Sequence, residues 1–517
     1  MKRHFLIPVV LLSALAVFAQ GSSEGSAKAP EKKGGASELL GPGNVTLKRL
    51  GYNTGFDVNT DYMVPVMEKS TGYKVEFSML PAQNPDQKLL MDVASGADYD
   101  IVNLSLNQFR TLLSKNALLP LNDLLDKYGQ DILKGNSQET WDTLSDGKGT
   151  IYGVPYMYPY DTEISKFIIV RMDLLRQAGI DKVPTTIDEL YATMSKLKSY
   201  YGDKYILLCG PYNAASEGIV NLNFPMNIAC AFGIYNDWMV DDNGKVIYLT
   251  EHPKFKEMVE FLTKCSKEGL FDSDWAANTT TSVSEKFASG KAIMACADRS
   301  LAQNAIPALK KTYSLSDDDF GFVSALFGAD GTCKYMKTTA INHVSAVLRG
   351  SKHPADAVNW MNLKVKDQLF INIGVEGTHF KWDPNDHSII PINPIFADER
   401  GDSYYYIDAT DAEAYKWQWP SRIRKSAAQW LAFNAVTIDF SKKHPEVFVP
   451  AYFSFMPASP NYAKYEITLS NNVNDFIFQI MAGTRTINDL SSFQKDWTAA
   501  GGEQVRAELQ SYLDSKK

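Results

Sequence analysis

Aromatic residues with polar neighbours recur along this sequence and say most about its chemistry. Tyr156 and Tyr158 lie in a stretch rich in proline and glycine, and Trp417 and Trp419 precede Arg422 in an irregular aromatic segment. Flat rings with polar rims can contact a ligand that has both apolar faces and polar edges. For each ring the alternative is packing in the core, and for each charged residue it is a solvated surface or an ion pair. The pattern favours ligand binding.

Similar combinations of rings with amide, carboxylate or guanidinium groups give a set of candidate ligand-binding residues. Two of them follow the first predicted strand, where ligand loops of an open α/β sheet lie. The set is Tyr52, Asn53, Tyr156, Tyr158, Phe224, Asn227, Trp275, Asp298, Arg299, Glu376, His379, Trp417, Trp419 and Arg422. Glu376 and His379 also suit a structural loop that buttresses a hinge, which we favour. Trp275 stands beside Asp272 and Asp274, and it suits the core as well as a ligand site.

Catalytic motifs do not occur in the sequence. It has no H-E-x-x-H zinc motif, no G-x-S-x-G elbow, no G-x-x-x-x-G-K-[ST] phosphate loop and no G-x-G-x-x-G fingerprint. The residues Asp241–Gly244 approach a calcium loop, but Met239 and Thr250 stand where the first and last ligands would be, so we predict a hairpin turn. We therefore expect a protein that is not an enzyme, with no catalytic residue, no metal and no cofactor.

The N-terminus has the pattern of an export signal. Two basic residues precede the 13-residue apolar run Phe5–Val17, and Ala19 offers a cleavage site. We predict a signal peptide over residues 1–19 and a flexible leader over residues 20–43, with retention by an uncleaved signal left open. Because Gln20 stands where a lipid-modified cysteine would follow the apolar run, we expect no lipid anchor. The predicted location is the periplasm or the outer face of the cell membrane.

Composition limits the class of protein further. Hydrophobic residues make up 45% and charged residues 22%, which are globular values. A formal net charge of −8 disfavours nucleic acid as a partner. A chain of 517 residues exceeds the size at which single cores stop growing, so two lobes are expected. The five cysteines have no C-x-x-C spacing, and we predict that they are small buried hydrophobic residues, with one disulfide possible as an alternative.

Hydrophobic periodicity predicts strands that alternate with helices, first over residues 45–128 and again after residue 171. Between these stretches, Ile151–Leu175 begins with tyrosines and prolines and continues into an apolar strand, Phe167–Val170, which we expect in the core. This segment is interpreted as a junction between two compact units. Thr186 and Glu189 form a capping box that starts a helix. The alternation indicates an α/β lobe with a mainly parallel sheet, followed by a second lobe.

Further predictions concern single elements. The strands of the first lobe are expected at 45–50, 73–79 and 100–104, and its helices at 61–70, 87–95, 107–113 and 121–128. In the second lobe, strands are expected at 206–209, 292–295 and 321–323, and helices at 171–178, 219–232, 253–268 and 283–289. Residues 339–348 form an apolar stretch that contains Asn342 and His343, a helix starts at Pro354, and the chain is mostly helical from Trp417 onward.

Eight short segments in sequence order resemble the large extracellular solute-binding proteins of bacterial ABC importers, of the carbohydrate-binding class related to maltodextrin receptors. The segment Gly374–Trp382, GVEGTHFKW, is similar to a subgroup often assigned to lipoproteins and complex oligosaccharides. The resemblance covers roughly residues 44–396 well and the C-terminal part loosely. The segments are Tyr99–Val102, Asn116–Leu124, Tyr152–Tyr156, Val170–Leu175, Pro184–Leu190, Phe287–Met294, Ser351–Val358 and Gly374–Trp382.

The resemblance implies a periplasmic-binding-protein-like (type II) fold of two α/β lobes, joined by a hinge, with the ligand between them. We expect the first lobe in residues 44–160 and 331–390, and the second in residues 161–330 and 391–517. The implied function is capture of an oligosaccharide by a monomer that delivers it to the transmembrane subunits of an ABC permease. An oligopeptide receptor and an exported carbohydrate-active enzyme are the alternatives. Four basic residues suggest an acidic sugar as one option: Arg299, Lys381, Arg422 and Arg424.

Overall fold

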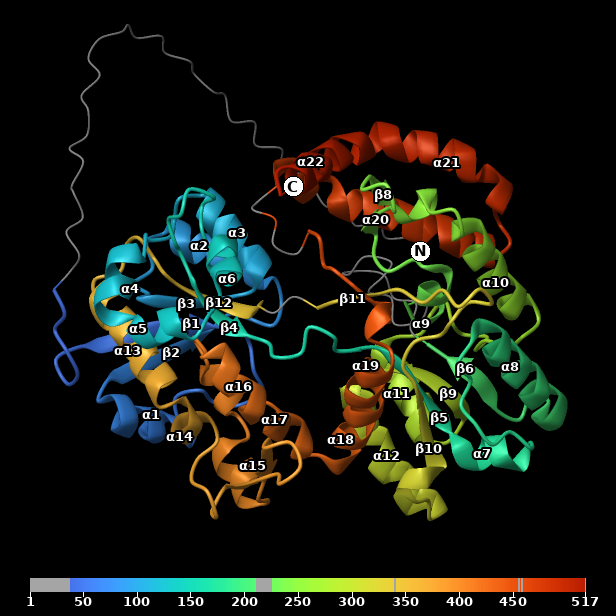
Figure 1. Cartoon of the computed structure of the whole chain (residues 1–517), viewed down its shortest axis with the longest axis horizontal. Helices are drawn as coiled ribbons and strands as arrows, with labels where there is room; N and C mark the ends of the chain where they lie inside the picture. Colours follow the sequence, from blue (N-terminus) through green and yellow to red (C-terminus); the bar gives the residue numbers. More distant parts are fainter. Residues whose placement is uncertain (1–37, 211–225, 339–340, 454–455, 457–458, 517) are drawn as a thin grey trace, which may run out of the picture. The chain divides into compact units, whose positions relative to one another are not determined.

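The first sheet has five strands in the order β2-β1-β3-β12-β4 (Figure 1). The computed structural model describes residues 38–210, 226–338, 341–453, 456 and 459–516. The strand β1 pairs in parallel with β2 and β3, and β12 pairs antiparallel with β3 and β4. Four strands therefore run in one direction, as predicted, and β12 opposes them. The strands are β1 (Thr46–Gly51), β2 (Lys74–Met79), β3 (Ile101–Leu104), β4 (Val154–Met157) and β12 (Ile341–Val347).

Helices pack on this sheet because local signals start and stop them close to its strands. Ser105 and Gln108 form a capping box at the start of α3, and Gly72, at φ 72°, ends α1. Trp360 of α13 is fully buried in the same core as Leu47 and Ile101 of the sheet. The helices are α1 (Met63–Thr71), α2 (Pro85–Ala94), α3 (Leu106–Ser114), α4 (Asn122–Tyr128), α5 (Gln130–Lys134), α6 (Gln138–Thr143), α13 (Pro354–Lys366) and α14 (Gln368–Asn372).

The second sheet has four strands in the order β10-β5-β9-β6. The strand β5 pairs antiparallel with β9 and β10, whereas β6 pairs in parallel with β9. Residues 167–170 of β5 are fully buried, which confirms the predicted core strand. Each sheet has one strand that runs against the others, β12 in the first sheet and β5 in the second. Each of these strands is formed where the chain arrives from the other sheet. The strands are β5 (Phe167–Arg171), β6 (Ile206–Cys209), β9 (Ala292–Ala297) and β10 (Phe320–Val323).

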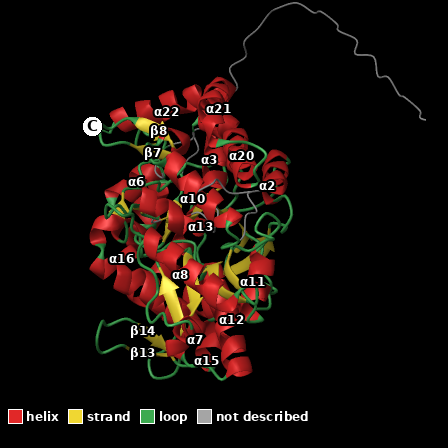
Figure 2. Cartoon of the chain, turned by 90° about the vertical axis from the view of Figure 1, so that its right-hand side faces the viewer, coloured by secondary structure: helices red, strands yellow, loops and turns green. Residues whose placement is uncertain are grey.

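In the second lobe α7, α8, α10 and α11 begin within three residues of the predicted positions, whereas α12 was not predicted. The capping box of Thr186 and Glu189 is present at the start of α8. The turn Asp241–Gly244 joins two antiparallel strands, which confirms the predicted hairpin. The elements are α7 (Met172–Gln177), α8 (Ile187–Tyr201), α9 (Met226–Ala229), β7 (Trp238–Val240), β8 (Val246–Tyr248), α10 (Phe255–Lys267), α11 (Thr280–Ala288) and α12 (Arg299–Tyr313). Figure 2 shows helices (red) around the shorter strands (yellow), as in other α/β proteins.

The C-terminal part is mostly helical and contributes to both lobes. Leu469 and Trp497 lie in the core of the second lobe. Tyr405 and Tyr406, by contrast, lie in the core of the first lobe, although the sequence assigned residues 391–517 to the second. The elements are β11 (Tyr335–Met336), β13 (Phe380–Trp382), β14 (Ile389–Pro391), α15 (Ile395–Arg400), α16 (Ala412–Gln418), α17 (Pro420–Arg424), α18 (Ala427–Phe433), α19 (Phe440–Lys443), β15 (Phe448–Val449), α20 (Pro460–Met481), α21 (Leu490–Trp497) and α22 (Glu503–Asp514).

The structure differs from the sequence-based expectations at one helix, and it shows whether the cysteines form a disulfide. Of the apolar helix expected over residues 219–232, the described part is a short α-helix, α9, followed by a 3-10 turn that ends at Gly233, where φ is 76°. The five cysteines, all within the described residues, are buried as predicted and form no disulfide. The predicted signal peptide and nearly all of the predicted leader lie outside the described residues.

Candidate functional site

Three rings stack at the edge of the first sheet where β1 and β4 end. Tyr52 follows β1 directly, Tyr156 lies in β4, and His343 lies opposite Tyr156 near the start of the antiparallel strand β12. The ring centroids of Tyr52 and His343 are 4.7 Å apart with an interplanar angle of 21°, and those of Tyr156 and His343 are 6.2 Å apart at 19°. His343 therefore lies between two tyrosines. Ligands of open α/β sheets bind at this kind of edge.

The row of rings continues along the segment that joins β4 to β5. The hydroxyls of Tyr156 and Tyr415 are 3.0 Å apart. Further along, the ring centroids of Tyr158 and Tyr160 lie 5.1 and 5.2 Å from that of Trp419. Trp419 in turn lies 5.1 Å from Phe433, the last residue of α18. We call these residues the aromatic band: Tyr52, His343, Tyr156, Tyr415, Tyr158, Trp419, Tyr160 and Phe433.

A charged pair borders the aromatic band. The guanidinium carbon of Arg299, at the start of α12, lies 5.3 Å from the ring centroid of Trp419, which is cation–π range. Its Nη2 atom is 3.0 Å from Oε1 of Glu163. Burial raises the pKa of Glu163, and the nearby Arg299 opposes that shift. Asp298 has a structural task, because its Oδ1 accepts the amide of Leu301 at 3.0 Å and caps α12.

A buried ionic cluster holds the segment that contacts Tyr52 of the aromatic band. Arg49 Nε donates to Asp408 Oδ1 at 2.7 Å, and Lys364 Nζ donates to Asp408 Oδ2 at 2.5 Å. Burial alone would raise the pKa of Asp408, but the two cations hold it below its ordinary value. The ring of Tyr405, three residues before Asp408, contacts that of Tyr52 edge-on at 5.1 Å. The cluster therefore fixes the segment that positions Tyr52.

The rims of the aromatic band are polar but uncharged at neutral pH. Burial, with a further contribution from Arg49, lowers the pKa of His343 to about 4, so its ring is neutral at pH 7. Burial raises the pKa of Tyr52. Nδ1 of His343 and the hydroxyl of Tyr158 are buried without a hydrogen-bond partner among the described residues. Buried polar groups normally have partners, so these two atoms are unsatisfied in this structure.

The band contains four of the predicted site residues and four that the sequence analysis did not single out. Tyr52, Tyr156, Tyr158 and Trp419 were predicted. Among the others, only His343 gave a signal, because it is a polar residue inside the apolar stretch 339–348. Tyr160, Tyr415 and Phe433 look like ordinary core aromatics in the sequence. Tyr156, at 4% exposure, and Trp419 are themselves buried within the band.

Two other predicted residues have structural contacts, and a third lies outside the described residues. Asn227 is fully buried, and its Nδ2 donates to the carbonyls of Lys166 at 3.0 Å and Ser324 at 2.7 Å. It thereby ties the segment before β5 to the segment after β10. Asn53 is exposed, and its Nδ2 donates to the carbonyl of Leu80 at 3.3 Å. Phe224 is the residue outside the described part of the chain.

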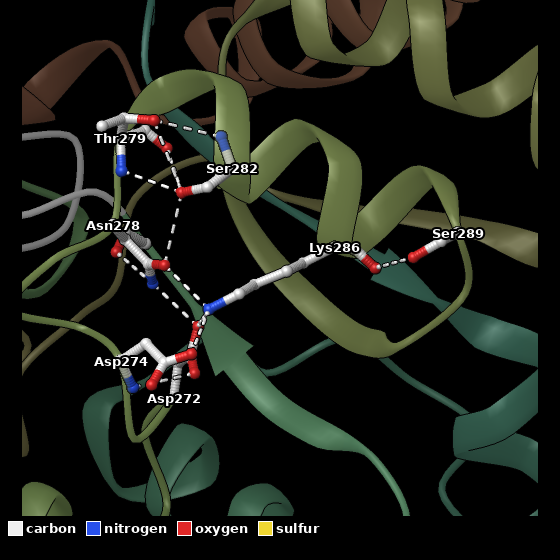
Figure 3. A network of polar contacts seen from close by, with 8 residues as sticks. Asp272, Asp274, Asn278, Thr279, Ser282, Lys286 and Ser289 are labelled. Carbon is white, nitrogen blue, oxygen red and sulfur yellow. Dashed lines mark hydrogen bonds and ion pairs between the residues drawn. The ribbon is translucent and has the colours of Figure 1, made fainter.

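Trp275 lies in the core of the second lobe, beside an ionic network. Its ring centroid is 5.4 Å from that of Phe478 in α20. The neighbouring carboxylates contact Lys286, whose Nζ lies 2.6 Å from Asp272 Oδ2 and 3.1 Å from Asp274 Oδ2 (Figure 3). The amide of Asn278 bonds both Asp272 and Lys286, as Figure 3 shows. The two acidic residues near Trp275, Asp272 and Asp274, are therefore paired with Lys286.

The predicted residues near the C-terminal end of the first lobe are mostly held by structural contacts. His379 is buried: its Nδ1 accepts the amide of Val375 at 3.0 Å, and its Nε2 lies 2.9 Å from Glu399 Oε2. These contacts agree with the favoured structural loop, in which Glu376 is exposed. Arg422 is buried, and its Nη1 donates to Ser403 Oγ at 2.6 Å. Trp417, by contrast, is 45% exposed.

Neither a membrane helix nor a metal cluster is found in the described part of the chain. No helix among the described residues is long and apolar enough to cross a membrane. The same residues contain no group of three or more histidine, cysteine, aspartate or glutamate side chains that could hold a metal ion. Within the aromatic band, Tyr156, Tyr415, Trp419 and Phe433 form a buried cluster. The half-buried members, which a ligand can contact, are Tyr52, His343, Tyr158 and Tyr160.

Two α/β lobes, each with one opposed strand where the chain crosses, define a periplasmic-binding-protein-like fold of type II. Residues 57–363 match the family model of the bacterial extracellular solute-binding proteins. The chain belongs to this family. The resemblance first noted in eight short segments is thereby confirmed.

Individual relatives are more distant. The chain is 23% identical over 319 residues to the fructooligosaccharide ABC transporter substrate-binding protein FusA of Streptococcus pneumoniae, which covers 54% of this chain and 55% of that protein. It is 22% identical over 337 residues to the lipoprotein LipO of Bacillus subtilis, which covers 61% of this chain and 63% of LipO. The chain thus spans a little over half the length of these two curated relatives.

Solved structures share the fold over nearly the whole chain. FusA of S. pneumoniae in complex with kestose superposes with a TM-score of 0.65 and 18% identity, over 91% of this chain and 99% of that one. An HMO-binding solute-binding protein associated with an ABC transporter of Bifidobacterium longum infantis gives a TM-score of 0.68 and 15% identity, over 92% and 99% of the two chains. At these identities the likeness concerns the fold.

Proposed function

We propose that this protein is the substrate-binding component of an ABC importer, which captures an oligosaccharide outside the cell membrane and delivers it to a membrane permease. The observation that carries the proposal is the aromatic band, with its neutral rings and the two polar atoms that lack partners. A pyranose or furanose ring has apolar C–H faces and hydroxyl edges, so it matches stacked rings with polar rims. Two relatives, named as substrate-binding proteins of a fructooligosaccharide and of a carbohydrate ABC transporter, support the same substrate class.

A neutral sugar suits the site better than an acidic one. Of the four basic residues that suggested a uronate, three already have partners in the structure. Arg299 is paired with Glu163, Arg424 Nη1 lies 2.9 Å from Asp383 Oδ2, and Arg422 bonds Ser403. A sugar carboxylate would have to displace the contacts of Arg299 and Arg424 to gain a bidentate one. The two nitrogens of Arg422 that lack a partner, Nε and Nη2, are buried. We therefore narrow the substrate class to neutral oligosaccharides.

Capture works by hinge closure in this proposal. The aromatic band draws its rings from strands of the first sheet, from the crossing segment and from α18, which packs on α12 of the second lobe. A ligand that touches residues of both lobes binds the closed state more tightly and shifts the population toward it. Asn227, which clamps the end of the crossing segment, supplies a fixed point for such a motion. The protein acts as a monomer without catalysis.

The peptide-receptor alternative makes a different demand on the site. Peptides are held mainly by backbone pairing and by charged contacts to their termini. Tyr156 of the band lies in the edge strand β4, but Thr410 occupies the outer edge of this strand: its amide donates to the carbonyl of Pro155 at 3.1 Å, and its hydroxyl accepts the amide of Met157 at 2.9 Å. The charges of Arg299 and Glu163 neutralise each other. Stacked rings favour sugars.

A thermal-shift panel tests the substrate class directly. Purified protein is heated with neutral oligosaccharides, uronate oligomers and oligopeptides. A ligand at a hundredfold excess over its Kd adds about 2.7 kcal/mol to the free energy of unfolding, so a true ligand raises Tm clearly. We expect neutral oligosaccharides to raise Tm and peptides to leave it unchanged. Stabilisation by peptides alone would contradict the proposal, and chromatographic detection of cleaved glycan after long incubation would contradict the absence of catalysis.

A further inference from the structure

Three aromatic rings gather on the surface next to the aromatic band. Trp382 ends β13, His387 lies in the turn between β13 and β14, and Trp417 lies on α16. The rings of Trp382 and His387 are stacked, with centroids 4.4 Å apart and an interplanar angle of 6°. The ring of Trp417 meets that of His387 at 6.1 Å and 66°. We call these three residues the aromatic platform.

The aromatic platform is exposed, so core packing does not account for it. Trp417 has 45% of its surface exposed, His387 is exposed, and Trp382 is half-buried. Large aromatic side chains are normally buried, and a cluster of exposed ones marks an interaction surface more often than a scattered single ring does. Folding gains little from the area that stays in water.

The β13–β14 turn is held in one conformation. The amide of His387 donates to the carbonyl of Asp383 at 2.9 Å, and the amide of Asp383 donates to the carbonyl of Ser388 at 2.7 Å. Asp383 Oδ2 is also 2.9 Å from Arg424 Nη1 on α17. His387 has φ 55°, a left-handed conformation that costs energy for a residue other than glycine. Strained backbone held by its surroundings is typical of ligand-binding segments, because it fixes a side chain in advance.

The platform is continuous with the aromatic band. Arg424, which holds the turn, lies over the ring of Trp430 at 4.1 Å, and Trp430 lies 6.0 Å from Phe433 of the band. Burial raises the pKa of Tyr160 to about 12, and the charge of Asp386 on the turn adds to this shift. A chain-like ligand that leaves the band would therefore meet the turn next.

We propose that the aromatic platform binds the distal sugar units of a long oligosaccharide whose other end occupies the aromatic band. The exposed ring of Trp417 offers a face for sugar C–H groups, whereas Trp382 is stacked on His387 and supports it. The exposed carboxylate of Asp386, which also contacts Ser388 and Arg424, accepts hydroxyls. This inference rests on the proposed function and adds a length preference to it. It predicts a receptor that binds long chains more tightly than short ones.

Oligosaccharides of matched chemistry and different length test the inference. Fructo-, manno-, xylo- and malto-oligosaccharides of about three and about eight units are titrated calorimetrically into the full protein and into Trp417→Ala. We expect the substitution to weaken binding of the longer member by about tenfold and that of the shorter member by less than about twofold. Tyr200→Ala is the matched control, because Tyr200 is an exposed ring, at 58%, on α8. Tyr200→Ala should leave the binding of both the longer and the shorter oligosaccharide unchanged.

A second variant guards against a structural effect at Trp417. In His387→Asn the ring is lost, but asparagine tolerates the left-handed backbone at this position, so the turn should keep its shape. We expect the same selective loss for longer chains. Equal binding of long chains by wild type and both variants overturns the inference, and so does an equal loss for long and short chains. If wild type binds none of these glycans, the proposed function fails and the inference fails with it.

Discussion

His343 lies between the rings of Tyr52 and Tyr156, and its protonation state matters for the site. Its pKa is lowered to about 4, first by burial and then by the charge of Arg49. The unfolded chain has an ordinary histidine pKa near 6.5, so it binds a proton between about pH 6.5 and 4 while the folded protein does not. Stability from this group is therefore complete above about pH 6.5 and is lost as the pH falls toward 4.

We predict a specific change in the pH dependence of stability when this ring is removed. In wild type, the free energy of unfolding should fall by up to about 3 kcal/mol on account of His343 as the pH drops from 7 to 4. His343→Gln should remove this part of the decline, because glutamine does not titrate. Urea titrations at several pH values measure it. The exposed His387→Asn serves as control and should keep the full decline. A His343→Gln curve parallel to that of wild type would show that the ring is not buried in its neutral form.

Tyr156 illustrates what the sequence could and could not reveal about single residues. Its type and position suggested a ligand contact. In the structure it is 4% exposed, and its hydroxyl lies 3.0 Å from that of Tyr415. The partner is 259 residues away, so no local pattern could have indicated the contact. Replacing Tyr156 by alanine would open a cavity and would not report on ligand binding alone.

At the scale of elements, local chemistry predicted well where a strong signal existed. The capping box of Thr186 and Glu189 marks the start of α8 in the sequence, and both reciprocal hydrogen bonds are present. The apolar run at 167–170 is a fully buried strand. The signal for a helix over 219–232 was only an apolar run, and an apolar run alone does not distinguish a helix from other buried structure.

The contribution of the α8 capping box can be measured. Thr186→Ala removes the oxygen that accepts the amide of Glu189 at 3.1 Å. We expect the free energy of unfolding to fall by about 1 kcal/mol, which is the usual cost of losing such a cap. Chemical denaturation gives the value. Thr468→Ala, at an exposed position inside α20, should not destabilise, since alanine favours helix. Equal effects of both substitutions would mean that the box does not stabilise α8.

At the scale of the whole molecule, the sequence predicted two α/β lobes and the order of their elements, because alternation and breakers are local. It assigned all of residues 391–517 to the second lobe, whereas Tyr405 and Tyr406 lie in the core of the first. Asp408, which follows them in the sequence, pairs with Arg49 of β1 and Lys364 of α13, and these contacts hold the segment there. Such a charge cluster assembles residues from three distant segments. Likewise, the aromatic band brings Trp419, which follows α16, and α18 to the crossing segment through contacts that only the fold reveals.

The central claim is that a neutral oligosaccharide closes the two lobes on each other. Small-angle X-ray scattering of the purified protein measures this most directly, with the glycan that gives the largest thermal shift at saturating concentration. We predict a smaller radius of gyration with the glycan than without it, and no change with an oligopeptide that fails to stabilise the protein. An unchanged radius of gyration in protein shown by calorimetry to be saturated with glycan would contradict capture by hinge closure.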